Sequence, residues 1–385
     1  MDFSWSDEQL ALRDEAQRFA SQHLGRDLVH RDQSGSDNLD FWREDWRKCA
    51  EFGVFGLSVP EEYGGRGRDI LTSILILEAI GYGCRDNGLT LVANGQIWAV
   101  QEPILSFGSD DQKRRYLPGL CDGSIIGAVS MTEHGAGSNA AGITTTAEPI
   151  DGGYVLNGAK AYVGLGPSCD VALVFASTAP DRGSWGISAF LVDAETPGFI
   201  RRPPQQKMGL RTTPMGEFIF DNCGVPKEAR LGREGAGLAI FQHIMEWERS
   251  FILASHVGSM RRQLDDCVDF ARSRIVFDQP IDQFQSVSNR LANMKLRLET
   301  AQLLLYKAAW LKAQGQSCPA EAALANLHMS EAFVESSLDA IRIHGGKGYL
   351  SETGIERDLR DAVGGVIYSG TSDIQRQIIA QLLKS

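Results

Sequence analysis

The sequence predicts an α+β fold in three consecutive parts: a helical part over residues 1–118, a β domain over residues 119–228 and a helical bundle over residues 229–385. Apolar residues first recur at steps of three and four. The period then shortens to two where turn residues become dense, and afterwards the helical period returns. An apolar fraction of 43% and a charged fraction of 23% are ordinary for a globular chain.

The first part opens on a helix signal. Ser6 is expected to cap the first helix, and Gln9, three residues later, completes a capping box. Further helical patterns cover residues 40–52, 70–83 and 110–117.

The middle part is expected to be a compact β domain. Asp151-Gly152 and Asn157-Gly158 are strong turn dipeptides between alternating runs. The predicted strands cover residues 125–131, 144–148, 153–156, 171–177, 186–193 and 215–220.

The third part is dominated by one long apolar stripe. Its members alternate steps of four and three, which suits helices packed in a bundle or across a subunit interface. The pattern does not distinguish burial within one chain from contact with a second chain. Ser372–Gln375 reads as a capping box that opens the last helix. The stripe consists of Val287, Leu291, Met294, Leu298, Ala301, Leu305 and Ala308.

Composition excludes several classes of protein. The formal net charge of −11 argues against nucleic acid as a partner, because a phosphate backbone demands a basic surface. Seven scattered cysteines without a C-x-x-C pair indicate neither a disulfide scaffold nor a zinc site. The first residues do not form a signal peptide, and the uncharged run 87–101 is too short to cross a bilayer. We therefore expect a cytoplasmic protein that is not embedded in a membrane.

A glycine-rich loop, Met131–Ser138, follows the apolar run 125–129 directly. Gly135 and Gly137 permit close backbone approach, and consecutive N–H groups in such a turn can bind an anion, with Ser138 adding a hydroxyl. An ordinary turn between strands is the alternative. The spacing is neither G-x-G-x-x-G nor a P-loop.

Read with its neighbours, this loop resembles the T-E-P-x-A-G-S-D signature of the acyl-CoA dehydrogenase family, flavoproteins that carry FAD. Five further motifs follow in the family's order. The resemblance implies a helical N-terminal domain, a barrel-like β middle domain and a C-terminal helical bundle. The five motifs are Gly152–Lys160, Gln206–Arg211, Arg274–Phe277 with Gln285, His344–Tyr349 and Ser369–Gln375.

The resemblance also implies the reaction. In this family a Glu takes the α-proton of an acyl thioester while the flavin N5 takes the β-hydride. Many members carry that Glu where this chain has Ser369, whose hydroxyl is too weak an acid to supply the base. Some members use instead a Glu directly before an Arg on another helix, which points here to Glu248 and Arg249.

Helical spacing supports Glu248 as the base. It shares a stripe with apolar residues, and desolvation there raises the pKa of a carboxyl group. A structural pairing of Glu248 with an Arg is the alternative. Glu246 lies off the stripe and is expected at the surface. Arg249 would neutralise charge or hold backbone, and the backbone N–H of Ser369 could polarise the thioester carbonyl.

The family's cofactor contacts are matched unevenly. The resemblance implies that one set of residues holds the FAD bound by the same subunit, and that another set reaches the FAD of a neighbouring subunit, so the protein would be a homodimer or homotetramer. His134 replaces the family's Pro, and Arg342 stands where most members have Gln. Gly164 lacks the Thr or Ser hydroxyl that bonds flavin N5 in the family. The first set is Met131, Thr132, Ser138, Tyr162 and Gly164, and the second is Arg274, Phe277 and Gln285. Thr371 and Asp373 match contacts at the adenosine end of the FAD, Arg342 is expected next to the pyrophosphate, and Gly346 is a further expected cofactor-binding residue.

Within the family, Gly83–Leu89 and Phe284–Arg290 look like bacterial natural-product members. The resemblance therefore implies an acyl or prolyl thioester on CoA or a carrier protein, with electrons passing to electron-transfer flavoprotein or another acceptor. Two alternatives stay open: a flavin oxidase or monooxygenase that uses O₂, and a non-catalytic scaffold that keeps the fold.

Overall fold

A computed structural model describes residues 4–35 and 40–384. Seven α-helices and a π-helical turn precede the sheet. Ser6 caps α1, and both hydrogen bonds of the predicted capping box with Gln9 are present. The elements are α1 (Asp7–His23), α2 (Leu28–Ser34), α3 (Asp40–Phe52), α4 (Ile70–Gly83), α5 (Asn87–Gly95), the π-helical turn η3 (Gln96–Gln101), α6 (Glu102–Phe107) and α7 (Asp110–Cys121).

The middle part folds into one eight-stranded sheet. Its order is β6-β7-β3-β2-β4-β5-β8, and β1 pairs in parallel with β4. All seven residues of β4 are buried, as expected for a central strand covered on both faces. The strands are β1 (Gly127–Ser130), β2 (Thr146–Ile150), β3 (Gly153–Gly164), β4 (Val171–Ser177), β5 (Ile187–Asp193), β6 (Phe199–Arg201), β7 (Met215–Pro226) and β8 (Arg230–Leu231).

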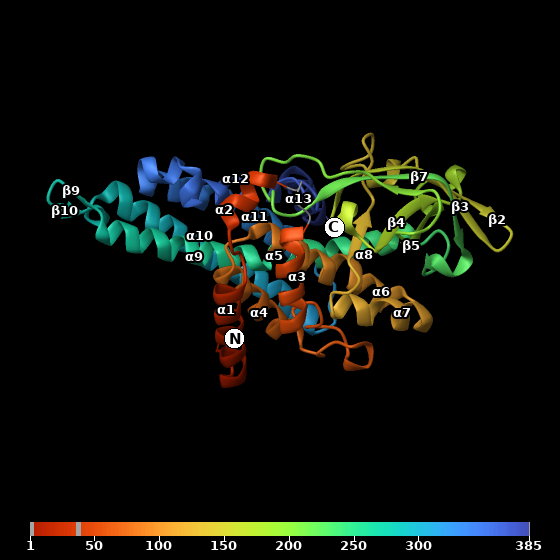
Figure 1. The fold of residues 1–385 in the computed structure, drawn as a ribbon, viewed down its shortest axis with the longest axis horizontal. Coiled ribbons are helices and arrows are strands. Elements are labelled where there is room, and N and C mark those ends of the chain that lie inside the picture. Colours follow the sequence, from red (N-terminus) through yellow and green to blue (C-terminus); the bar gives the residue numbers. More distant parts are fainter. Residues whose placement is uncertain (1–3, 36–39, 385) are drawn as a thin grey trace.

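The last part is a helical bundle that extends away from the sheet (Figure 1). A small hairpin, β9–β10, lies at the end of the molecule opposite the sheet. The bundle elements are α8 (Gly237–Phe251), α9 (Ala254–Ser273), β9 (Ile275–Val276), β10 (Gln279–Pro280), α10 (Gln285–Ala313), α11 (Pro319–His344), α12 (Ile355–Gly365) and α13 (Ser372–Leu382).

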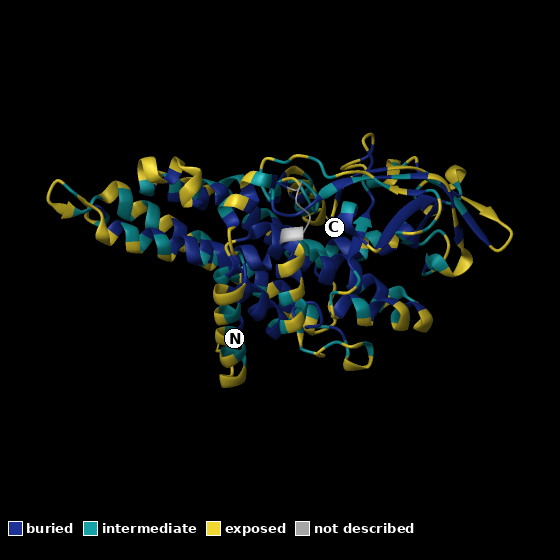
Figure 2. Cartoon of the chain, in the orientation of Figure 1, coloured by how far each residue is buried: buried dark blue, intermediate teal, exposed yellow. Residues whose placement is uncertain are grey.

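Helices α4 and α9 cross at two glycines. A Cβ atom at Gly81 would stand 1.8 Å from the Ser255 carbonyl oxygen, and one at Gly258 would stand 1.9 Å from the Glu78 carbonyl oxygen. Only glycine permits this backbone approach. The crossing joins the N-terminal helices to the bundle, and buried residues run through all three parts of the chain (Figure 2).

The long stripe on α10 is buried within the chain. Met294, Leu298, Ala301, Leu305 and Ala308 are all buried in the core. Leu296, Leu303 and Trp310, at intervals of seven residues, are instead exposed. The stripe seen in the sequence is therefore an internal packing face, and α10 carries a second apolar stripe on its surface.

The last helix is capped differently from the prediction. Thr371, not Ser372, is the N-cap of α13, because the Ile374 N–H donates to the Thr371 hydroxyl oxygen at 3.2 Å. The Ser372 hydroxyl is buried without a hydrogen-bond partner. The two adjacent hydroxyl residues made the sequence signal ambiguous by one position, and the extended backbone of Thr371 (ψ 156°) decides it.

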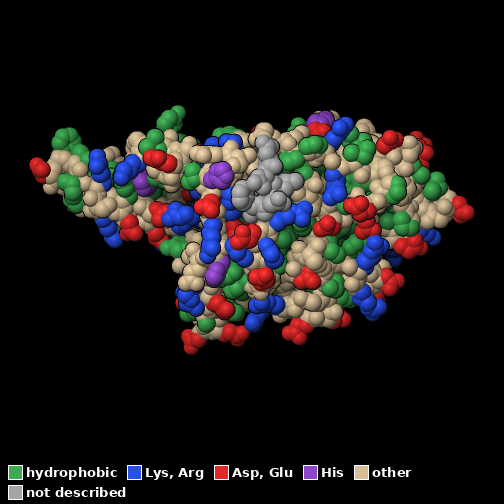
Figure 3. Space-filling view, viewed as in Figure 1, with side chains coloured by type: hydrophobic (Ala, Val, Ile, Leu, Met, Phe, Trp, Pro, Cys, Tyr) green, Lys and Arg blue, Asp and Glu red, His purple; other side chains and the backbone are tan. Residues whose placement is uncertain are grey.

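The face shown in Figure 3 carries charges of both signs interspersed. Ion pairs join different elements of the chain, as in Arg115 of α7 with Asp193 of β5 at 2.6 Å. Within the described residues, no helix combines the length and the apolar character needed to cross a membrane.

Candidate active site

Glu248 and Ser369 meet although 121 positions separate them in the chain. The Ser369 hydroxyl donates to Glu248 Oε1 at 2.6 Å. Glu248 lies in the last turn of α8, and Ser369 lies in the turn between α12 and α13. The two positions at which the family is expected to carry its base are thus direct neighbours.

The backbone of Ser369 is held in an unusual conformation. Its φ is +56°, a left-handed value that costs free energy for a residue with a side chain. Gln375, which is fully buried, donates through Nε2 to the carbonyl oxygens of Ser369 and Gly370 at 3.0 and 2.8 Å. Arg249 Nε also donates to the Ser369 carbonyl oxygen, at 3.4 Å. These contacts hold the turn that presents the hydroxyl.

Burial dominates the electrostatics of Glu248. Desolvation raises the pKa of this carboxyl group above its ordinary value, while the Ser369 hydroxyl and the Arg249 charge partly oppose the rise. Burial also lowers the pKa of the Arg249 guanidinium. A carboxylate with a raised pKa is a better proton acceptor than an exposed one.

Glu246 corrects one expectation from the sequence. It is not a free surface residue, because its carboxylate pairs with Lys312 of α10 and accepts from the Cys318 N–H at 2.8 Å and from the Ser317 hydroxyl at 2.9 Å. Ser317 and Cys318 belong to the connection between α10 and α11, so Glu246 ties α8 to the bundle.

The glycine-rich loop is organised by a residue that the sequence analysis left unassigned. Glu133 is buried, and its carboxylate accepts from the backbone N–H and hydroxyl groups of both Thr144 and Thr145 at 2.6–3.0 Å. Lys160 Nζ lies 2.9 Å from Glu133 Oε1 and 3.0 Å from the Met131 carbonyl oxygen. The signal for this cluster was available, since Glu133 and Lys160 both lie in the quoted motifs.

Several predicted cofactor residues gather around that loop. Met131 is buried, Thr132 is half-buried, and Ser138 is exposed. The Ala161 N–H donates to the Thr132 carbonyl oxygen at 2.9 Å, which fixes the end of β3 against the loop. The His134 and Tyr162 rings are in edge contact, with centroids 5.6 Å apart.

Tyr162 lies where the pairing of β3 with β7 is irregular, between Lys160 and Val163, and has a φ of +58°. Bulges of this kind redirect side chains near active sites. Gly164, two residues on, is exposed, and a Cβ built on it meets no atom within 4 Å. The same is true of Gly135 and Gly137 in the loop. Each of these three positions leaves its backbone open to a ligand.

A second set of predicted residues lies at the far end of the bundle. Arg274 and Phe277 lie at the β9–β10 hairpin, Phe277 is 86% exposed with a φ of +49°, and Gln285 begins α10. Arg342 donates to Asp339 at 3.2 Å, and a Cβ built on the exposed Gly346 meets no atom within 4 Å. Phe270 of α9 stacks on His344 at 4.3 Å, which ties these ends of α9 and α11 together.

The chain therefore does not bring all its predicted cofactor residues to one place. The Met131–Ser138 loop lies with the sheet, whereas the β9–β10 hairpin lies at the opposite end of the molecule (Figure 1). The Glu248–Ser369 pair is linked to the first set by the turn before β7, which is hydrogen-bonded both to α12 and to the residue after β3. In this turn the Leu210 N–H donates to Asp361 of α12 at 2.6 Å, and the Pro214 carbonyl accepts from the Leu165 N–H at 2.9 Å.

The start of α13 also carries two predicted residues. The oxygen of Thr371 accepts the capping hydrogen bond, which leaves its hydroxyl proton to donate elsewhere. The Asp373 side chain is 94% exposed and pairs with Arg376 at 3.2 Å.

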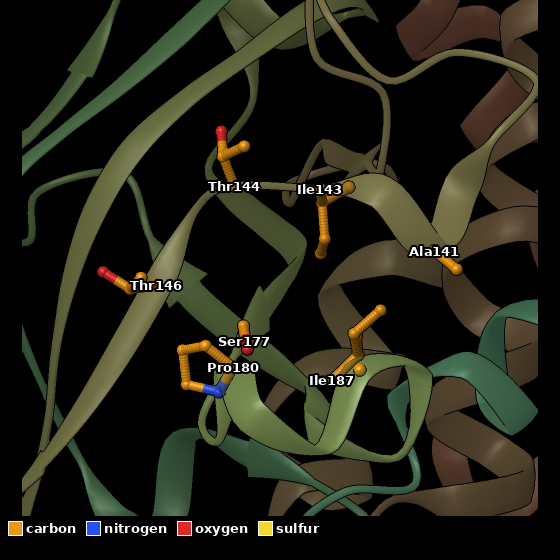
Figure 4. A pocket seen from close by; sticks show the side chains of 8 residues that line it. Ala141, Ile143, Thr144, Thr146, Ser177, Pro180 and Ile187 are labelled. Atoms are coloured by element: carbon orange, nitrogen blue, oxygen red, sulfur yellow. The ribbon is translucent and has the colours of Figure 1, made fainter.

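One hollow of about 270 Å³ lies beside the loop and apart from Glu248 (Figure 4). In the close-up, Ile143 and Ile187 extend towards each other across it. Thr144, which binds Glu133, forms part of its wall, so the glycine-rich loop and the hollow share a support. None of its lining residues was predicted as a site residue.

This arrangement of N-terminal helices, middle sheet and C-terminal bundle is that of the acyl-CoA dehydrogenases. The family's N-terminal, middle and C-terminal domain models match residues 6–124, 128–223 and 235–384. The chain belongs to the acyl-CoA dehydrogenase family. It is an FAD-dependent oxidoreductase that dehydrogenates acyl thioesters, and the predicted fold class and cofactor are confirmed.

Two curated relatives are L-prolyl-[peptidyl-carrier protein] dehydrogenases. The one from Pseudomonas fluorescens is 43% identical over 89% of this chain and 91% of its own length. The one from Serratia is 39% identical over 100% of this chain and 98% of its own.

Solved structures agree with these relatives. The prolyl acyl carrier protein oxidase AnaB superposes with a TM-score of 0.97 at 46% identity, over 99% of this chain and 100% of AnaB. PigA, in a structure with FAD and proline, gives 0.94 at 38% identity, over 100% of this chain and 99% of PigA. Butyryl-CoA dehydrogenase from Megasphaera elsdenii gives 0.94 at 33%, with both chains covered completely.

The residues around the loop fit an FAD. Gly135, Gly137 and Gly164 leave room for a flat or phosphate-bearing group, since side chains built there meet nothing within 4 Å. Ser138 and Thr132 add hydroxyl groups to the loop. Ser369, Tyr162 and Phe277 are three of the eight non-glycine residues with positive φ among those described, and such strain gathers at functional sites.

Proposed function

We propose that this enzyme removes two hydrogens from the Cα–Cβ bond of a prolyl group held as a thioester on a carrier protein, with Glu248 as the base. The observation that carries the base assignment is the half-buried Glu248 carboxylate and its 2.6 Å hydrogen bond from Ser369. The prolyl substrate is supported by similarity to relatives with that activity over nearly the whole chain.

In the proposed reaction Glu248 takes the Cα proton, and the β-hydrogen leaves with its electron pair, so that a Cα=Cβ double bond forms. FAD, when bound, supplies the acceptor for that hydride. Arg249 keeps a positive charge beside the carboxylate, and the Ser369 N–H donates towards the thioester carbonyl, where charge builds up as the proton leaves. The loop around Thr132, Ser138 and Gly164 supplies the surface on which the flavin is positioned.

We further propose that the active site is completed by a second copy of the chain. Arg274, Phe277 and Gln285 are presented at the end of the bundle opposite the loop, so a cofactor that contacts both sets must lie between two chains. The exposed side chains of Phe277 and Tyr349 at that end support a contact there. The enzyme would be a homodimer or homotetramer.

The seven cysteines are all unpaired and buried, which supports a place in the reducing cytoplasm. We propose electron-transfer flavoprotein as the electron acceptor, with O₂ as the alternative. The open position at Gly164 favours the alternative, because it leaves space beside the expected flavin.

The test mixes purified enzyme anaerobically with prolyl-carrier protein, free proline and butyryl-CoA, and follows bleaching of the flavin and loss of two hydrogens by mass spectrometry. We expect prolyl-carrier protein to react. Glu248→Gln should retain FAD and lose reduction by a factor on the order of 10² to 10⁴. Near-native reduction in Glu248→Gln would refute the base assignment, and reaction with butyryl-CoA alone would refute the substrate. Reoxidation by air within one turnover would identify an oxidase.

A further inference from the structure

We propose that Ser369 is a positioning residue for the base: its hydroxyl holds Glu248 Oε1 so that Oε2 is directed at the substrate. The inference rests on the proposed function, since it concerns the same carboxylate. The terminal torsion of a Glu side chain has only a broad preference, so a carboxylate keeps a fixed orientation only if one of its oxygens is held. Within the described part of the chain, Oε2 accepts no hydrogen bond, whereas Oε1 accepts one at 2.6 Å.

The backbone around Ser369 fixes the direction of this hydrogen bond. Ser369 has a φ of +56°, and Gly370 follows at +89°. A Cβ on Gly370 would stand 2.9 Å from Gln375 Nε2, so the glycine lets Gln375 reach both carbonyl oxygens of the turn. Gln375, near the start of α13, therefore holds the strained turn, and the backbone conformation of the turn fixes the direction of the Ser369 hydroxyl.

The charged groups around Glu248 are few. On α8 its neighbour Arg249 is the nearest cation, and Glu246 is neutralised by Lys312 of α10. From the turn after α12, the Tyr368 phenol faces the carboxylate, and its pKa is raised by burial and then by Asp361 of α12 and by Glu248. Tyr368 Oη has no hydrogen-bond partner in the described structure. Among the described residues, Ser369 is thus the one neutral donor whose hydrogen bond reaches the carboxylate.

A hydroxyl that donates to a carboxylate stabilises its charged form and lowers its pKa, against the effect of burial. Ser369 therefore has two effects on the reaction. It orients the base, and it keeps the base ionised at a lower pH than burial alone would allow.

The test measures the pH dependence of anaerobic flavin reduction by the reacting thioester in Ser369→Ala and Ser369→Gly. Both variants remove the hydroxyl, but glycine also relieves the positive φ, so shared effects belong to the hydroxyl. We expect the acid limb of the profile to move up by about one to two pH units, with the maximal rate about tenfold lower. FAD content should stay unchanged. Ser336→Ala removes a hydroxyl that is buried and, unlike that of Ser369, has no hydrogen-bond partner, so this variant should match the wild type.

A second variant tests the support of the turn separately from the presence of the Ser369 hydroxyl. Gln375→Met keeps the volume but cannot hold the turn, so it should lower the rate with Ser369 still present. The proposal is overturned if both Ser369 variants keep the wild-type pH profile while Glu248→Gln is inactive. Activity in Glu248→Gln would instead overturn the proposed function, so the two failures are distinct.

Discussion

Gly164 is the predicted cofactor residue that departs most from the family's motif. It ends β3 opposite Met215, it is exposed, and nothing lies within 4 Å of a Cβ built on it. If Gly164 occupies the position that bonds flavin N5 in the family, as the resemblance predicts, N5 is left to be bonded by backbone groups or by nothing. The space itself is compatible with either a weaker hold on the flavin or room for a bulky acyl group.

Restoring the hydroxyl tests these two roles. In Gly164→Ser and Gly164→Thr we expect the flavin reduction potential to shift by about 10 to 30 mV, the equivalent of one net hydrogen bond in a two-electron couple. If the space serves the acyl group, the potential stays constant and substrate-induced spectral changes disappear. Potentiometric and substrate titrations of both variants decide between them. If neither quantity changes, Gly164 does not lie at the flavin.

Single residues were predicted unevenly. Glu248 was selected because the apolar stripe and the Glu-Arg pair agree, but its contact with Ser369 joins positions 121 apart and has no local signal. Glu246 was predicted at the surface. The prediction missed its contact with Lys312, because the two residues lie 66 positions apart in the chain. The assignment of catalytic and cofactor roles to the predicted residues stays a prediction.

At the scale of elements, the Glu133 cluster explains why the glycine-rich loop keeps its shape. Hydrogen bonds from Thr144 and Thr145 and the charge of Lys160 lower the pKa of Glu133 to about 2, although burial acts in the opposite direction. Because this folded-state pKa lies below the ordinary 4.5, the carboxylate stabilises the fold above pH 4.5, and this stabilisation is lost as the pH falls towards 2.

We expect this loss to reach about 1.4 kcal/mol at pH 3.5. Glu133→Gln should lower Tm at pH 7, because it leaves Lys160 buried without its counter-ion, and should then show a smaller further fall between pH 5 and 3.5 than the wild type. Glu148→Gln, at an exposed position on β2, is the matched control and should follow the wild type. Thermal unfolding at the three pH values checks this, and equal pH sensitivity in all three proteins would contradict it.

Elements with a long periodic pattern were predicted well, and short ones were not. α3, α4 and β4 have the bounds expected from the sequence, because each is a long apolar pattern between turn signals. β6 and β8, with three and two residues, were missed since a strand that short carries no period. β3 was expected to end at Leu156 but runs to Gly164, because pairing with β7 continues it past the Asn157-Gly158 turn signal. The domain division at residues 118 and 228 stays a proposal.

At the scale of the whole molecule, the elongated shape separates two sets of groups that the proposed cofactor site needs. The loop of one copy and the hairpin of another would form each site. α10 also exposes Leu296, Leu303 and Trp310 in a row, an apolar face that a second copy could cover.

A mixing experiment tests the shared site. We expect Ser138→Asp in the loop and Arg274→Glu at the hairpin each to abolish FAD binding. In a mixed dimer, one site combines the intact loop of one chain with the intact hairpin of the other. Co-expression should therefore restore about a quarter of the sites, if the chains pair at random.

The control co-expresses two variants that both change the loop, Ser138→Asp and Thr132→Asp. No mixed dimer then has an intact loop, so FAD binding should not be restored. FAD content per chain, measured with the mass of the assembly in solution, is the readout. A monomer that binds FAD fully, or mixed variants that stay empty, would contradict a site built from two chains.

The contact between Ser369 and Glu248 also limits how such an enzyme can evolve. A carboxylate at position 369 would lie within hydrogen-bonding distance of Glu248, and two carboxylates so close share one proton and do not both ionise. A base that moved between these positions one substitution at a time would therefore pass through a chain with both acids, which share a proton, or through a chain with neither, which has no base.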